Sequence, residues 1–168
     1  MSLEGTVTQA FDLVLREPSP IMLLFQEKDG DKLVPIDSDF LEFLVMAGGI
    51  GKDIMSATIK KVCALVKPFA YVIIMEAWYL DGTMIPEGEA ERIYNEGKSI
   101  AEHPARKECV QIIVGGQDRT IARAWDILRN ESGDRYGLAK IHAMDNDDGK
   151  GVFTGRFADL NIQQHAKH

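Results

Sequence analysis

The stretch CVQIIVGGQDRTIARAWDIL, residues Cys109–Leu128, decides how this chain folds. Its first six residues form an apolar run typical of a strand, and the next four, Gly115–Asp118, are turn formers. The second apolar run is compatible with a helix, but Ile121, Trp125 and Ile127 all fall on one face of a strand. We therefore expect two successive strands joined by a glycine turn, within a largely antiparallel meander.

Further strands flank this pair on both sides. Ala70–Leu80 is apolar at nearly every position, which is typical of a central strand with both faces buried. Downstream, the turn sequence Asn130–Asp134 leads into a strand over Tyr136–Met144. A last short strand is expected over Val152–Phe157, after a polar turn at 145–151.

The N-terminal part of the chain supplies a helix and a hairpin. Apolar residues at helical spacing predict a helix over Leu3–Glu17, which the following prolines end. Two apolar runs, Ile21–Gln26 and Lys32–Ile36, flank an Asp-Gly turn and predict a hairpin. Pro35 indicates that the second of these strands lies near a sheet edge, because proline cannot donate to a central ladder.

Two more helices are expected after the hairpin, at about 39–47 and 52–67. The first follows the start signal Asp-Ser-Asp, and Pro68 ends the second. The second helix has an apolar stripe at four-residue and three-residue spacing, formed by Met55, Ile59, Val62 and Val66.

The order of these elements predicts an α+β fold. We expect a largely antiparallel sheet of about five to six strands with two to three helices packed on one face. A doubly wound fold is excluded because strands and helices do not alternate. The 168 residues are expected to form a single domain over 1–162, followed by a frayed tail at 163–168.

Composition restricts the possible functions. The formal net charge of −7 repels phosphate backbones over most of the surface, so we expect no nucleic-acid partner. Two separate cysteines cannot form the disulfide framework of a secreted domain, and we expect neither a signal peptide nor a membrane-spanning run. The expected location is cytoplasmic, with no membrane partner.

Apparent ligand motifs fail at named positions. The glycines of 48–51 precede Lys52, but a phosphate loop needs a hydroxyl where Asp53 stands. The acidic run 145–149 does not place its glycine at the sixth position of a calcium loop, and only weak cation binding is conceivable there. The four histidines show no metal-ligand spacing. We therefore predict no cofactor and no metal.

The segment SIAEHPARKECVQII, residues 99–113, concentrates reactive residue types. Ser99, His103 and Glu102 are the residue types of a nucleophile, a base and its orienting acid, and Cys109 lies near them. No nucleophile elbow accompanies Ser99. The alternative interpretation is a structural turn at the end of a long acidic loop, residues 82–106, with a short helix around 89–96.

Glu76 is a carboxylate in the middle of the predicted central strand. A buried carboxylate must find a partner or accept a raised pKa, and Arg106 and Arg123 are the candidate partners. We expect an ion pair, most readily with Arg106. The alternative is a ligand-contacting or catalytic acid.

The strand end Glu76-Ala77-Trp78, with the loop that closes on 104–108, resembles uncharacterised bacterial and phage proteins. The resemblance covers Tyr71–Leu128. It implies a bacterial or phage protein and no particular activity, so no functional residues follow from it.

Two functions remain after these tests. The first is a non-enzymatic cytoplasmic interaction protein that binds a protein partner or itself, most simply as a homodimer. The first helix can dock its apolar stripe on its own sheet or on a neighbour's, and an open sheet edge is the second expected surface. The alternative is a small-molecule hydrolase that uses Glu76, His103 and Arg106 at the mouth of the 82–106 loop. An enzyme requires these three to converge on a pocket, whereas an interaction protein requires an exposed apolar patch.

Overall fold

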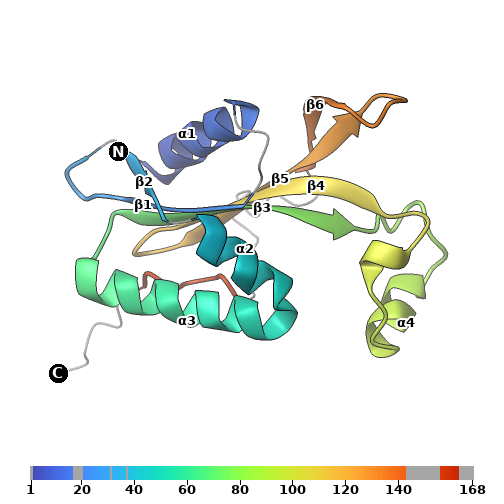
Figure 1. Ribbon diagram of the computed structural model, residues 1–168, viewed down its shortest axis with the longest axis horizontal. Coiled ribbons are helices and arrows are strands. Elements are labelled where there is room, and N and C mark those ends of the chain that lie inside the picture. The colour runs from blue at the N-terminus through green and yellow to red at the C-terminus, as the bar shows by residue number, and fades with distance from the viewer. Residues whose placement is uncertain (1, 17–20, 31, 37, 143–155, 163–168) are drawn as a thin grey trace.

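The structure is a computed structural model that describes residues 2–16, 21–30, 32–36, 38–142 and 156–162 (Figure 1). Its elements in chain order are α1 (Leu3–Arg16), β1 (Met22–Gln26), β2 (Leu33–Pro35), α2 (Ser38–Met46), α3 (Gly48–Val66), β3 (Ala70–Tyr79), α4 (Glu89–Asn95), a short 3₁₀ helix (Ile100–Glu102), β4 (Lys107–Gly115), β5 (Thr120–Arg129) and β6 (Arg135–Lys140).

The described strands form one antiparallel sheet in the order β2-β1-β3-β4-β5-β6. The glycine turn between β4 and β5 pairs Gly115 with Thr120, and the N–H of Gly116 donates to the carbonyl of Arg119 at 2.9 Å. The predicted α+β class, the central position of β3 and the edge position of β2 are confirmed. The predicted strand over 152–157, the turn at 145–151 and the tail at 163–168 lie largely or wholly outside the described residues.

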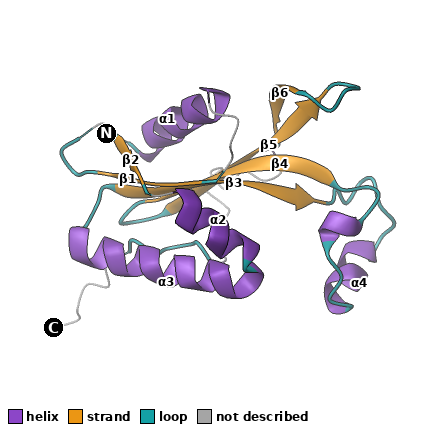
Figure 2. Ribbon diagram, viewed as in Figure 1, coloured by secondary structure: helices purple, strands orange, loops and turns teal. Residues whose placement is uncertain are grey.

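The sheet is covered by helices on both faces (Figure 2). The expected pair of helices, α2 and α3, packs on one face, and α1 covers the opposite face. Two buried clusters result because alternate residues of each strand point to opposite faces. Val72 and Ile74 face α1, whereas Tyr71 and Ile73 face α2 and α3.

Helix α1 is docked on its own sheet. It buries the apolar stripe Leu3, Val7, Ala10 and Val14, with Thr6 hydrogen-bonded to the buried Gln26. The Phe11 ring lies 4.6 Å from the ring of Trp125, measured between centroids. The alternative that this stripe docks on a second chain is therefore wrong, because the sheet of the same chain already covers it.

Helices α2 and α3 meet at a tight corner. A Cβ built on Gly51 of α3 would lie 1.7 Å from the carbonyl oxygen of Leu44 in α2, so only glycine allows this approach. Leu41 and Leu44 of α2 are buried. On α3, the residues that face the sheet are Gly51, Met55, Ile59 and Cys63.

The described C-terminal residues 156–162 close the layer beneath the sheet. The hydroxyl of Tyr71 donates to the carbonyl of Phe157 at 2.6 Å, and the side-chain amide of Asn161 donates to the carbonyl of Pro68 at 3.2 Å. Phe157 and Leu160 are buried against α3 and the sheet. Burial also raises the pKa of Tyr71 to about 12, which keeps the hydroxyl protonated and able to donate.

The sheet extends beyond the helices that cover it. The end of β3 and the β5–β6 hairpin project past α1 and α3, and α4 lies at that end, away from the other helices (Figure 1). Residues 70–75 of β3 are buried, but from Glu76 onward exposed residues alternate with half-buried ones. The strand is thus buried on both faces only over residues 70–75.

Candidate functional site

The polar cluster of the 82–106 segment is the first candidate site. The segment leaves the sheet after β3 and returns at the start of β4, where Lys107 pairs with Asp81 at 3.3 Å and joins its two ends. Asp81 also accepts hydrogen bonds from the amide and hydroxyl of Thr83, and these bonds lower the pKa of its carboxyl group. Helix α4 confirms the short helix expected near 89–96.

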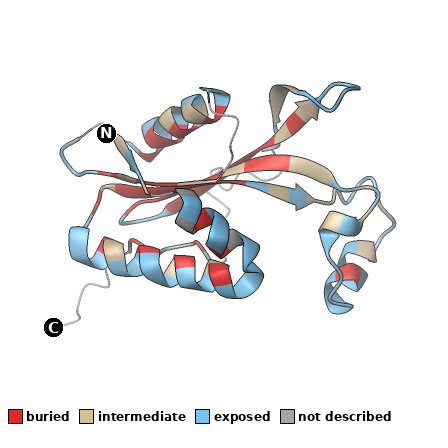
Figure 3. Cartoon of the chain, in the orientation of Figure 1, coloured by how far each residue is buried: buried red, intermediate tan, exposed pale blue. Residues whose placement is uncertain are grey.

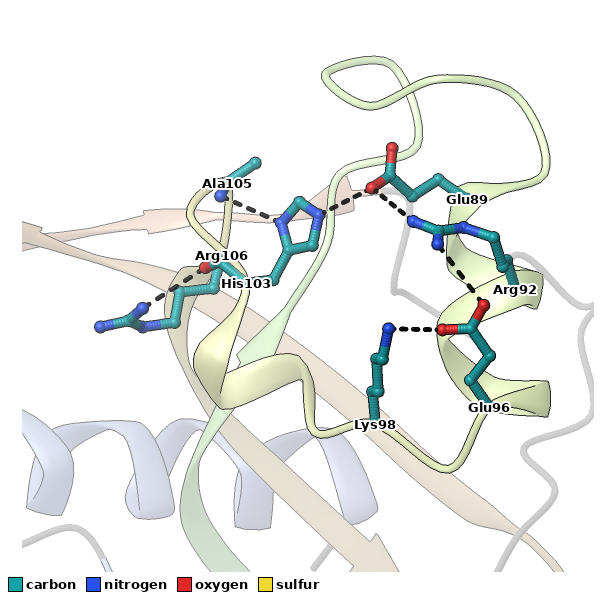
Figure 4. Close-up of polar contacts among 7 residues, drawn as sticks. All are labelled: Glu89, Arg92, Glu96, Lys98, His103, Ala105 and Arg106. Atoms are coloured by element: carbon teal, nitrogen blue, oxygen red, sulfur yellow. Dashed lines mark hydrogen bonds and ion pairs between the residues drawn. The ribbon is translucent and has the colours of Figure 1, made fainter.

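His103 connects the return of this segment to α4 (Figure 4). Its Nδ1 accepts the backbone N–H of Ala105 at 3.0 Å, so the ring proton resides on Nε2. Nε2 then donates to the Glu89 carboxylate at 3.2 Å. Since both ring nitrogens are engaged within the segment, this arrangement holds the loop closed and leaves no nitrogen to act as a general base.

A chain of ion pairs continues along α4. Arg92 lies between Glu89 and Glu96, with nitrogen–oxygen distances of 3.4 Å to each carboxylate. Lys98 contacts the other oxygen of Glu96 at 2.6 Å, and this bond, with the charges of Lys98 and Arg92, lowers the pKa of Glu96. These exposed pairs contribute little to stability individually, but together they satisfy the charges of the segment within the segment.

Arg106 lies against the aromatic ring of Trp78. Its guanidinium carbon is 4.8 Å from the ring centroid, and one terminal nitrogen donates to the carbonyl of His103 at 3.4 Å. Arg106 therefore contacts the backbone of His103. Over the described residues, no hydrogen bond or ion pair joins the side chains of any two of Glu76, His103 and Arg106.

The predicted ion pair of Glu76 is wrong. Glu76 is exposed, and within the described part of the chain it pairs with neither Arg106 nor Arg123. Arg123 is buried and instead pairs with Glu4 of α1 at 3.5 Å. The physical reason is that Glu76 lies past the edge of the helix layer, where no buried environment demands a counter-ion.

Glu76 nevertheless has a raised pKa. Partial removal of water on the sheet surface is the main cause, and the neighbouring carboxylate of Glu108 adds to it. Arg129 and Arg135 oppose the shift only through their charges. Arg129 is already committed to Glu108, with one contact at 2.5 Å and a second at 3.3 Å.

Ser99 and Cys109 have structural roles in this fold. The Ser99 hydroxyl accepts the N–H of Ala101 at 3.2 Å and caps the 3₁₀ helix, as serine commonly does at a helix start. Cys109 is fully buried in β4, and burial raises the pKa of its thiol to about 11. A thiol in this state is a poor nucleophile at neutral pH.

A second candidate site is the exposed apolar surface of α2 and α3. The pale blue side of α3 in Figure 3 faces away from the sheet and continues around the α2–α3 corner. Among the exposed large apolar side chains, six lie on these two helices, and one of them, Val66, lines the pocket between α3 and the β1–β2 hairpin. We call the other five the outer face: Phe43, Met46, Ile50, Ile54 and Leu65.

Sequence reasoning found only one of the two apolar stripes of α3. Met55 and Ile59 face the core as predicted, but Val66, placed in the same stripe, is 67% exposed because it lies at the end of the helix. The signal for the second stripe was present, since Ile50 and Ile54 recur at the same four-residue spacing on the opposite side. When a helix that is apolar on two sides packs on a sheet through one side, the other apolar side is left exposed.

A pocket of about 370 Å³ lies between the β1–β2 hairpin and the C-terminal end of α3. It is lined by Phe25, Val34, Val62 and Val66, with Lys28 and Lys67 beside them, and none of the three predicted site residues borders it. Within the described residues, no group of three or more His, Cys, Asp or Glu side chains is placed to hold a metal ion. Nor does that part of the chain contain a helix long and apolar enough to cross a membrane.

The chain matches no protein-family model, no curated protein and no solved structure. The roles of its residues are therefore assigned from their geometry alone.

Proposed function

We propose that this protein is a non-enzymatic interaction protein that associates with another protein chain through the outer face. The observation that carries the proposal is the exposure of this face: Phe43 is 69%, Met46 88%, Ile50 73% and Leu65 77% exposed. Isolated apolar side chains are normal on a surface, but neighbouring ones along one helix and its corner are typical of an interaction site.

The polar cluster supports the same proposal because its histidine and arginine already interact with other groups of the chain. His103 uses both ring nitrogens inside the loop, and Arg106 lies on Trp78. The alternative of a small-molecule hydrolase that uses Glu76, His103 and Arg106 has no observation of its own, because no hydrogen bond or ion pair joins their side chains in the described structure.

A matched pair of variants tests the proposal. Ile50→Glu places a charge in the outer face, whereas Leu15→Glu places one on the exposed side of α1, where Leu15 is 58% exposed. Both positions are helical and tolerate glutamate well. We expect size exclusion with light scattering to show a smaller mass for Ile50→Glu than for wild type and for Leu15→Glu. Equal masses above that of one chain for all three, with circular dichroism confirming that each is folded, would overturn the proposal, because the outer face would then take no part in the association.

A further inference from the structure

We infer, on the basis of the proposed function, that the partner is a second copy of this chain and that α3 packs antiparallel against its counterpart about a twofold axis near Ala57. The spacing, the sizes and the charges of the residues exposed along α3 support this arrangement.

The spacing is that of a helix-pairing seam. Ile50, Ile54, Ala57, Lys61 and Ala64 are separated by four, three, four and three residues, and all five are exposed. This alternation keeps one line of side chains on the same side of a helix and is the repeat used by paired helices. With 19 residues, α3 is about 28 Å long, which is enough for a continuous contact.

The sizes of the seam residues favour the antiparallel arrangement. The midpoint of the exposed seam is Ala57, so a twofold axis there places Ile50 of one copy opposite Ala64 of the other. The large Ile50 then meets the small Ala64, while Ile54 lies opposite Lys60. The two copies of Ala57 at the centre allow the helix backbones to approach closely. A parallel arrangement would place each isoleucine against the same isoleucine and each alanine against the same alanine, which packs less evenly.

The charges favour the same arrangement. About an axis at Ala57, Asp53 of one copy lies opposite Lys61 of the other, and this pairing occurs twice by symmetry. Asp53 already accepts a bond from Arg156 at 2.5 Å through one oxygen, and a carboxylate can accept more than one donor. In the parallel arrangement Lys61 would face Lys61 across the seam, which is repulsive.

The rest of the outer face extends the same match. Phe43 and Met46 lie beyond Ile50 at the N-terminal end of the seam, and Leu65 lies at its C-terminal end. An antiparallel pair places these two apolar ends against each other. The surface is therefore complementary to itself, as a closed dimer about a twofold axis requires.

Single-cysteine cross-linking tests the geometry. The native Cys63 and Cys109 are buried and their thiol pKa values are raised to about 11, so they provide a low background. The variants are Ala57→Cys, Ile50→Cys and the double variant Ile50→Cys with Ala64→Cys, with Leu15→Cys as the control on α1. Each is oxidised with copper phenanthroline and, separately, treated with a short bis-maleimide.

We expect Ala57→Cys and the double variant to migrate mainly as covalent dimers on a non-reducing gel, while Ile50→Cys and Leu15→Cys remain mainly monomeric. Efficient linking of Ile50→Cys alone would indicate a parallel pair and overturn the inference. A chain that is dimeric by light scattering but links at none of the α3 positions would also overturn it, and would leave the proposed function standing. A chain that is monomeric by light scattering would overturn the inference that the partner is a second copy, and would leave the proposed function with a different protein chain as partner.

Discussion

The 82–106 segment and the outer face are both exposed, but they differ in how far their side chains are engaged by other groups of the chain. In the segment, Glu89, Arg92 and Glu96 have partners a few residues away, and both nitrogens of His103 are engaged. On the outer face, large apolar side chains are exposed to solvent. A concentration of reactive residue types is here a self-contained structural unit. The binding that we propose uses instead apolar side chains that have no reactive groups.

The largest expected effect separates the two sides of α3. Ile59→Ala removes a fully buried side chain and should lower the free energy of unfolding by about 2–5 kcal/mol. Ile54→Ala, on the outer face of the same helix, should change it by no more than about 0.5 kcal/mol in the monomer. Urea unfolding at low protein concentration measures both. Equal losses would mean that the outer face is packed within the monomer, and the comparison would fail.

The next effect concerns the corner that presents the outer face. Gly51→Ala forces a Cβ against the carbonyl of Leu44 and should cost about 1–3 kcal/mol through displacement of α2. Gly49→Ala is the matched control, because its Cβ would meet only the Arg156 guanidinium at 3.9 Å, an ordinary contact. Thermal unfolding should therefore show a lowered melting temperature for Gly51→Ala alone. Similar melting temperatures would show that the α2–α3 approach is not tight.

A smaller and local effect is expected in the polar cluster. His103→Ala removes the connection to Glu89 and leaves the N–H of Ala105 without its acceptor. We expect faster proteolytic cleavage within 82–106, with a loss of global stability below about 1 kcal/mol. Glu102→Ala, at an exposed position beside it, serves as the control. Unchanged cleavage of the His103 variant would show that the histidine does not hold the loop closed.

The smallest effect depends on pH and concerns Glu76. Its pKa is raised in the folded chain above the ordinary value of 4.5, so the folded state favours the protonated carboxyl. Stability from this group is therefore fully present below the unfolded-state pKa and is lost as pH rises through the folded-state pKa. Glu76→Gln should match wild type at about pH 4 and exceed it by a few tenths of a kcal/mol at about pH 7, after allowance for solvent screening.

Urea unfolding at both pH values checks this prediction, with Glu131→Gln in the exposed β5–β6 turn as the control. A loss of stability for Glu76→Gln at neutral pH would mean that Glu76 has a stabilising partner, as its place in an apolar run first suggested.

Much of the fold could be predicted from local sequence. The Gly115-Gly116 turn between two apolar runs identified β4 and β5, and Pro35 identified the edge position of β2, because these signals act through the backbone itself. The limits of burial could not be predicted in the same way. Glu76 belongs to the same continuous apolar run as Ile74, but α1 covers only the first part of β3, and the extent of a covering helix is a tertiary property.

The candidate sites show the same difference between features that local sequence predicts and features that depend on tertiary structure. The residue types near His103 were correctly found to be concentrated, but only geometry shows that Ala105 and Glu89 use both of its nitrogens. The outer face was within reach of sequence reasoning, since the spacing of Ile50 and Ile54 is helical. It was missed because one apolar stripe already accounted for the packing of α3.

The mass of the wild-type chain in solution tests the central claim most directly. Light scattering coupled to size exclusion, over a dilution series that begins in the micromolar range, should give twice the chain mass of 18.7 kDa at the highest concentrations and fall toward 18.7 kDa on dilution. This dependence follows because an isologous pair dissociates by mass action. A mass of 18.7 kDa at every concentration would contradict the account, because the outer face would then be an exposed surface with no second copy bound to it.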